Sequence, residues 1–225
     1  MANLFEDEVH RIYHGTTNPD FKPYYGGGKD YHDYGKGLYC TKDLEAAKEW
    51  ACQSTDTSVS YVYVYDLNMR GVAPVLDLYA LEPLFWLSAL AQYRYGRSES
   101  NARRERRLKF ISLFPINCED YEVIRGWRAD DRYFAYFSAF LSLDISYEAV
   151  VQAMMLGDLG QQIVLKGEAA YSRCRQVDKI VISGDNYFKC NTQYIERERK
   201  AEGNLQYVRD IPGIMLDKIL EKGGL

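Results

Sequence analysis

The segment Tyr61–Tyr65 constrains the fold most strongly, because its sequence YVYVY alternates aromatic and β-branched residues with a period of two. That period places successive side chains on opposite faces of a β-strand, and both residue types favour strands. The whole chain contains 20 tyrosines beside 9 Phe and 3 Trp. Rings with a polar end suit strands and stacking surfaces, since the ring is buried while the hydroxyl stays in contact with water. The sequence therefore predicts a sheet rich in tyrosine.

Other segments on both sides of this strand carry periodicity and capping signals of their own. Strands are expected at Val9–His14, Val75–Leu78, Gln162–Lys166 and Lys179–Ser183. Helices are expected at Leu44–Gln53 (capped by Thr41), Leu81–Tyr93, Asp131–Leu143, Tyr147–Leu156 (capped by Ser146), Glu168–Cys174 and Ile211–Leu220, while Arg103–Phe110 is a charged helix or loop. Because strands stand near both ends and helices in the middle, we expect an α+β fold, with mostly antiparallel strands and an inserted block of helices.

The size and charge of the chain exclude several classes of protein. With 225 residues and a formal net charge of -4, it has the length of one large domain and lacks the basic excess of a nucleic-acid coat. The longest apolar stretch, Phe85–Ala91, is far shorter than the ~20 residues that a membrane span needs. Residues 1–8 are acidic and lack the basic start and apolar run of a signal peptide. We therefore expect a cytoplasmic protein, or one exported without a signal peptide, that does not bind membranes.

The common metal and nucleotide motifs are missing from the sequence. The 5 cysteines include no CxxC pair, HExxH is absent, and the 3 histidines lack metal-ligand spacing, so no metal site is expected. The segments Gly26–Gly28 and Gly35–Gly37 lack the Lys-Ser or Lys-Thr pair of a phosphate-binding loop, and neither GxGxxG nor GxSxG occurs. The basic run Arg103–Lys109 could contact phosphate, but a solvated helix face is the favoured interpretation.

Three short segments carry the functional signal. They are Tyr13–Thr16 (YHGT) at the end of the first strand, Tyr34–Thr41 (YGKGLYCT) before the helix that contains Trp50, and Gln161–Lys166 (QQIVLK) in a late strand. Together they resemble the H-Y-E motif of the ADP-ribosyltransferase superfamily, on the side of diphtheria toxin and the poly(ADP-ribose) polymerases. More closely, they resemble an uncharacterised bacterial family with YHGT, GKGFYLT, a late Gln-Ile strand and an Ala-Asp-Asp-Arg segment, matched here by residues 129–132.

This resemblance covers residues 10–175 and implies the ADP-ribosyltransferase fold, in which a split sheet encloses extended NAD without a metal. NAD would be the substrate that is cleaved. The resemblance assigns His14 to the ribose on the adenosine side and Tyr39 to stacking on the nicotinamide ring. It places Gln162 at the position of the catalytic glutamate.

The same resemblance implies further binding residues around the dinucleotide. Gly15 would hold the nicotinamide carboxamide through its backbone, and Thr16 would contact the dinucleotide with its hydroxyl. Gly37 would let the turn bend where a side chain would clash. Trp50 would face Tyr39, so that two rings sandwich the flat leaving group. Each residue alone has an ordinary structural explanation, a strand-edge or core position, and it is their common order that favours an NAD site.

Two departures from the superfamily pattern bear on activity. Gln162 removes the negative charge that would favour a developing oxocarbenium ion, and Ala47 stands where the polymerases have a serine that bonds the carboxamide. A glutamine oxygen can still accept a hydrogen bond from the ribose 2′-hydroxyl. We therefore expect slow nicotinamide release, which Gln162→Glu would accelerate.

The expected function is mono-ADP-ribosyl transfer from NAD to an unidentified protein or nucleic-acid acceptor. One rival is an inactive NAD-binding or interaction module, and another is a toxin held by a neutralising partner protein. Residues 1–185 form the expected transferase-like domain, and residues 186–225 form a C-terminal extension. Asp130, Asp131 and Arg132 either begin a helix or belong to the site.

Overall fold

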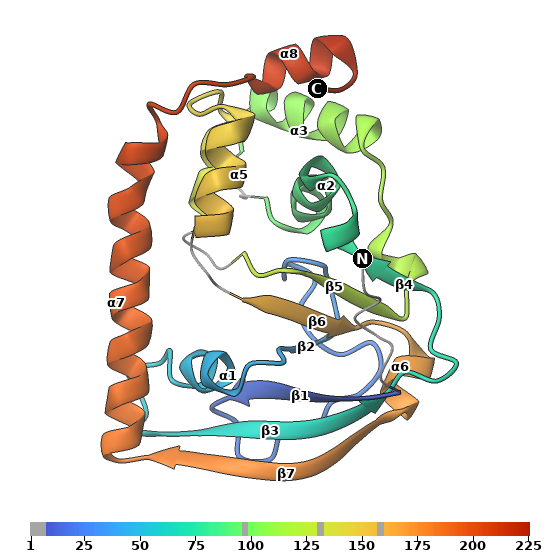
Figure 1. Ribbon diagram of the computed structural model, residues 1–225, viewed down its shortest axis with the longest axis vertical. Coiled ribbons are helices and arrows are strands. Elements are labelled where there is room, and N and C mark those ends of the chain that lie inside the picture. Colours follow the sequence, from blue (N-terminus) through green and yellow to red (C-terminus); the bar gives the residue numbers. More distant parts are fainter. Residues whose placement is uncertain (1–7, 96–98, 130–132, 157–159) are drawn as a thin grey trace.

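The computed structural model describes residues 8–95, 99–129, 133–156 and 160–225, and it is an α+β protein with two sheets (Figure 1). The first sheet is antiparallel, with the order β1-β3-β7, from Val9–Thr16, Val59–Asn68 and Cys174–Ser183. The second has the order β2-β6-β5-β4, from Leu38–Cys40, Gln161–Leu165, Val123–Trp127 and Val75–Asp77. Its pairs are antiparallel except β4–β5, which is parallel.

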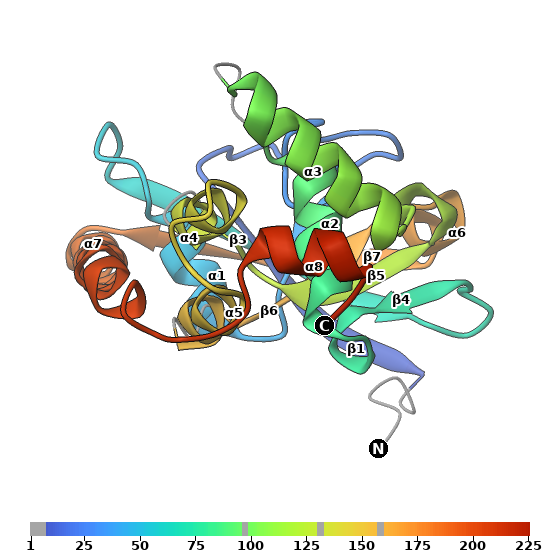
Figure 2. The ribbon, with the colours of Figure 1, turned by 90° about the horizontal axis from the view of Figure 1, so that it is seen from above.

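Helices pack on both sheets. They are α1 Leu44–Ala51, α2 Pro83–Tyr93, α3 Asn101–Leu113, α4 Tyr133–Leu141, α5 Tyr147–Leu156, α6 Glu168–Ser172, α7 Asp185–Val208 and α8 Leu216–Lys222, with 3₁₀ turns at Leu78–Ala80 and Cys118–Asp120. Helices α2 to α5 pack on the second sheet, whereas α1 packs on the first. The expected helical block is α2 to α5, which lies between β4 and β6 in the chain. Trp86, Phe110 and Phe137 are buried in the core between this block and the second sheet. Figure 2 shows α3 and α8 lying over α2.

The predicted YVYVY strand is the centre of the first sheet, and both of its faces are buried. Tyr63 and Tyr65 enter the core between the two sheets, where they pack with residues such as Ile163. Val62 points to the other face and packs with Ala47 of α1. The alternation in the sequence is therefore confirmed, because Tyr63 and Tyr65 belong to one core and Val62 to another.

One isolated bridge joins the backbones of the two sheets. Tyr13 of β1 donates to the carbonyl of Thr41 at 2.8 Å and accepts from the amide of Thr41 at 3.0 Å. Thr41 was expected to cap α1, but the cap is Asp43, whose side chain accepts from the amides of Glu45 and Ala46. Thr41 instead uses its backbone for the bridge, and its hydroxyl accepts from the amide of Asp43 at 3.1 Å.

The C-terminal residues pack on α1, beside the first sheet, and on the helical block of α2 to α5. The sequence did not predict α7, which runs from the first sheet to the level of α5 and packs on α1 and α5 (Figure 1). Near its start, Tyr187 donates to the carbonyl of Ser54 and Asn191 donates to that of Cys52, both at 2.6 Å. The last helix begins at Leu216 rather than Ile211. Residues 186–225, expected as an extension, thus pack directly on the preceding domain.

The basic run lies in α3, and part of it stabilises the fold. Arg107 is buried and bonds Glu99 at 3.0 Å and the carbonyl of Ala91 at 3.0 Å. Arg103 donates to the hydroxyl of Ser138 at 2.5 Å. The exposed cations of this helix are therefore fewer than the sequence suggests. Among the residues described, none of the helices has the length and apolar character needed to cross a membrane.

A packing constraint at Gly15 gives a first prediction. A Cβ at this position would overlap the carbonyl oxygen of Ala47 and lie 2.8 Å from the amide nitrogen of Ala51, both on α1. We expect Gly15→Ala to lower the free energy of unfolding by about 1–3 kcal/mol or more, since the clash involves backbone. Urea denaturation measures the change, with Gly224→Ala as the control, because a Cβ at Gly224 meets nothing within 4 Å. Equal stabilities of the two variants would contradict this packing.

Candidate functional site

A cavity of about 680 Å³ opens beside the bridge between the two sheets. All seven residues proposed for the site from the sequence line this cavity: His14, Gly15, Thr16, Gly37, Tyr39, Trp50 and Gln162. They come from β1, the turn before β2, β2 itself, α1 and β6. Residues far apart in the chain therefore converge as expected. Asp130, Asp131 and Arg132 lie outside the described residues.

The ring of His14 is fixed by a backbone hydrogen bond and a stacked neighbour. Its Nδ1 lies 2.7 Å from the carbonyl oxygen of Tyr39, and a carbonyl only accepts, so Nδ1 carries the proton. Burial lowers the pKa of His14 to about 4, so the imidazole is neutral at neutral pH and Nε2 is an acceptor. Phe21 stacks on the ring at 4.3 Å. The amide of Phe21 in turn donates to the hydroxyl of Tyr63 in β3 at 3.1 Å.

The backbone of Gly15 faces the open side of β1. Alternate residues of a strand point their N–H and C=O groups to the same side. Because both groups of Tyr13 bond Thr41 of the other sheet, those of Gly15 also point away from β3, toward the cavity. Gly15 thus offers one donor and one acceptor there, next to the hydroxyl-bearing Thr16. The hydroxyl of Thr16 accepts from the amide of Asn18 at 3.2 Å.

The hydroxyl of Tyr39 organises the turn before β2, and its ring lines the cavity. It accepts from the amide of Tyr34 at 2.8 Å and donates to the carbonyl of Gly35 at 2.7 Å. Burial raises the pKa of Tyr39 well above its ordinary value, so the phenol stays neutral. At Gly37 a Cβ would lie 2.7 Å from Val164 and 2.8 Å from the carbonyl oxygen of Leu165, both in β6. The turn can lie this close to β6 only because Gly37 has no side chain.

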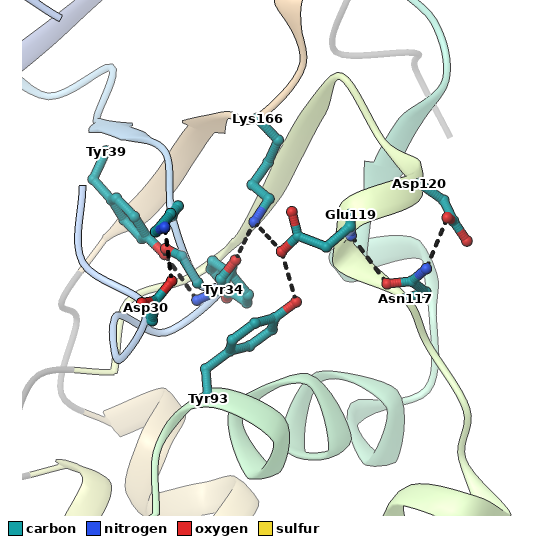
Figure 3. A network of polar contacts seen from close by, with 10 residues as sticks. Asp30, Tyr34, Tyr39, Tyr93, Asn117, Glu119, Asp120 and Lys166 are labelled. Carbon is teal, nitrogen blue, oxygen red and sulfur yellow. Dashed lines mark hydrogen bonds and ion pairs between the residues drawn. The ribbon is translucent and has the colours of Figure 1, made fainter. Parts of the chain in front are cut away.

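A buried lysine anchors the same turn, and Figure 3 shows its ammonium between Tyr34 and Glu119. Lys166 is buried, and its ammonium donates to the carbonyl of Tyr34 at 2.8 Å and to Glu119 at 2.6 Å. Tyr93 donates to the same carboxylate oxygen at 3.0 Å. Tyr34 itself is fully buried and donates its hydroxyl to the carbonyl of Trp127 at 2.6 Å. The turn that carries Tyr39 is therefore held at several points.

Trp50 lines the cavity, and a cationic side chain lies over its ring. The guanidinium of Arg128 lies 4.7 Å from the ring centroid, within the range of a cation–π interaction. Ala47, one turn earlier on α1, is fully buried and offers no hydroxyl to the cavity. Tyr39 packs its ring against Tyr34 and His32. Trp50 and Tyr39, the two rings of the expected sandwich, thus both border the cavity. Arg128 contacts the first ring, and other aromatic side chains contact the second.

Gln162 is buried at the start of β6, and its partner is a carboxylate that the sequence analysis did not single out. The side-chain nitrogen of Gln162 donates to Asp33 at 3.0 Å. Asp33 is buried too, lines the cavity, and accepts from the amide of Ala129 at 2.9 Å. Arg94 lies 3.7 Å from its other oxygen. Burial raises the pKa of Asp33, and Arg94 and the two hydrogen bonds oppose that shift.

The described lining also includes other residues that the sequence analysis missed, and most of the charged ones are cationic. Lys22, Lys29, Arg94 and Arg128 line the cavity, against the single carboxylate of Asp33 among the described residues. Tyr194 reaches it from α7. Only Arg128 had a sequence signal, since it directly precedes the Ala-Asp-Asp-Arg segment. In the described part of the chain, no group of three or more His, Cys, Asp or Glu side chains could hold a metal ion.

The two bridged sheets and this polar, aromatic cavity define an α+β protein with a ligand-sized site where its sheets meet. A family model described as "Protein of unknown function (DUF3990)" matches residues 10–175. The chain therefore belongs to this family. Comparison with curated proteins gave no match, and comparison with solved structures gave none either. The match agrees with the resemblance to an uncharacterised family and carries no activity with it.

The neutral imidazole gives a prediction about pH. Since the pKa of His14 is lowered from 6.5 to about 4, the unfolded chain binds a proton in this window that the folded protein does not. The free energy of unfolding should therefore decrease as the pH falls from 6.5 to about 4. NMR titration of the ring protons tests this directly, with His14→Gln to assign the signal among the 3 histidines. A His14 midpoint near 6.5 would contradict the burial of this ring.

The anchoring of the turn gives a prediction about stability. Lys166→Met removes the ammonium that bonds Tyr34, so we expect the free energy of unfolding to fall by about 1–3 kcal/mol. Lys36→Met is the matched control, because Lys36 forms an exposed pair with Asp30 at 3.3 Å. That pair should contribute less than about 1 kcal/mol. Equal losses in urea denaturation would show that Lys166 does not hold the turn.

Proposed function

We propose that the protein transfers single ADP-ribose units from NAD to a macromolecular acceptor and releases nicotinamide. The observation that carries this proposal is the convergence of His14, Gly15, Tyr39, Trp50 and Gln162 on one cavity. Its volume of about 680 Å³ lies within the range of small-molecule and cofactor sites. The proposal includes the ADP-ribosyltransferase fold, in which NAD lies between the two sheets.

The chemistry of each side chain supports a dinucleotide as the ligand. The neutral ring of His14 offers an acceptor to a ribose hydroxyl. The N–H and C=O of Gly15 match the carbonyl and amino groups of a carboxamide. The rings of Tyr39 and Trp50 offer flat apolar surface to nicotinamide. The cationic side chains of the lining suit the diphosphate, which carries the negative charge of NAD.

In the proposed reaction the bond between the ribose carbon C1′ and the nicotinamide nitrogen breaks. Nicotinamide leaves with the bonding electron pair, so positive charge grows on the ribosyl ring. A nucleophilic group of the acceptor then bonds to C1′ and gives up its proton. If water takes the place of the acceptor, the reaction is hydrolysis of NAD.

NAD binding tests the proposal first. NAD should raise the melting temperature of the wild type by mass action and quench the fluorescence of Trp50, and EDTA should change neither effect. His14→Ala should lose most of this stabilisation. The control is Leu108→Ala on the exposed surface of α3, away from the lining, which should keep it. Equal stabilisation of the wild type and His14→Ala would contradict the assigned role of His14.

Turnover distinguishes the transferase from a module that only binds. The wild type should release nicotinamide slowly and attach labelled ADP-ribose to a component of a cell lysate, and His14→Ala should do neither. NAD binding without release of nicotinamide or labelling would instead favour the binding module. That outcome would overturn the enzymatic part of the proposal.

A further inference from the structure

Asp33 and Gln162 form a buried pair across the floor of the cavity. They lie 129 positions apart in the chain, and the carboxylate oxygen Oδ2 accepts from Nε2 of Gln162 at 3.0 Å. The same oxygen accepts from the amide of Ala129 at 2.9 Å. The relative exposure of Gln162 is 4% and that of Asp33 is 6%. Such a pair excludes water from its contact and is held by strand β6 and by the backbone after β5.

This contact determines which way the amide of Gln162 points. A carboxylate oxygen is an acceptor, so it must face the NH₂ end of the amide rather than its oxygen. The oxygen Oε1 is then turned away from Asp33. It is buried and has no hydrogen-bond partner among the described residues, while Gln162 lines the cavity. A buried acceptor without a partner is unfavourable, and a hydroxyl of a bound ligand would satisfy it.

Burial raises the pKa of Asp33, but its polar neighbours stabilise the charged form. Two N–H groups donate to Oδ2, and the guanidinium of Arg94 lies 3.7 Å from Oδ1. A proton on either oxygen would displace a donor or face a cation. The pair therefore places a negative charge directly behind the amide that borders the cavity. Burial in surroundings of low polarity strengthens the field of this charge.

We propose that Asp33 is a positioning residue for Gln162, and that the pair together performs the role that a single glutamate would have in cleaving NAD. Asp33 holds Oε1 of Gln162 toward the ribose 2′-hydroxyl, and its charge stabilises the positive charge that grows on the ribosyl ring as nicotinamide leaves. This inference rests on the proposed function. It also changes the expectation for Gln162→Glu, because a second carboxylate would lie against the first.

Three variants separate charge from orientation. Asp33→Asn keeps an oxygen that accepts from Ala129 and Gln162, but it removes the charge. Gln162→Glu places two carboxyl groups in contact, where one of them must take up a proton or move away. The double variant Asp33→Asn/Gln162→Glu leaves one carboxylate, now at position 162. Asp30→Asn is the matched control, because Asp30 is an exposed carboxylate of the same loop and is not part of the lining.

The experiment measures kcat and KM for nicotinamide release, together with the melting temperature of each protein. We expect Asp33→Asn to lower kcat about tenfold or more, with a much smaller change in KM and in melting temperature. The double variant should recover most of the lost kcat and exceed Gln162→Glu. Asp30→Asn should behave as the wild type.

Two results would overturn the inference, and they differ in what else they affect. If Asp33→Asn keeps the kcat of the wild type, or if the double variant is no faster than Gln162→Glu, Asp33 has no part in the reaction and the proposed function is unaffected. If the wild type neither binds NAD nor releases nicotinamide, the proposed function fails and this inference fails with it.

Discussion

The two backbone hydrogen bonds between Tyr13 and Thr41 determine where the cavity lies, because the pairing of the sheets stops there. Continuing the same register would place Gly15 opposite Tyr39. Instead, the carbonyl oxygen of Tyr39 accepts a hydrogen bond from the ring of His14 at 2.7 Å. The two strand edges therefore separate directly after the bridge, and their backbone groups face a space that a planar polar ligand can enter. An open strand edge is normally a liability, but here it is enclosed by other elements.

The long loop between β1 and β2 forms one wall of this space, and tertiary contacts replace the regular hydrogen bonds that a loop lacks. Tyr63 of the central strand holds its first part, so the ring of Phe21 reaches His14. Tyr34 is held at its amide, its carbonyl and its hydroxyl by three different parts of the chain. A glycine-rich segment thereby gains a defined conformation, and this fixes the positions of the residues next to Tyr34.

The parts of the molecule that could be predicted are those governed by local sequence. The alternation at Tyr61–Tyr65 predicts β3 correctly. The convergence of His14 and Tyr39 on one cavity was implied by the resemblance of their motifs to a known family, not by local periodicity. By contrast, α7 is mostly polar and is stabilised by distant contacts such as that of Tyr187 with Ser54, which no local period reveals. Asp33 was missed for the same reason. A carboxylate in a glycine-rich loop is normally solvated, but Asp33 is buried and hydrogen-bonded to Gln162, 129 positions away.

The presence of Asp33 gives the glutamine at position 162 a physical explanation other than loss of activity. A carboxylate at that position would meet the carboxylate of Asp33 at the distance that now separates Asp33 from the amide nitrogen, 3.0 Å. Two such groups in a buried site cannot both stay ionised, so the pair would still hold about one negative charge. A glutamine beside an aspartate holds the same charge and adds a defined hydrogen bond. It also leaves one amide oxygen for the ligand. In the sequence, the glutamine at position 162 looks like the loss of a catalytic carboxylate. In the structure, a carboxylate is still present next to it, on Asp33 instead of on residue 162.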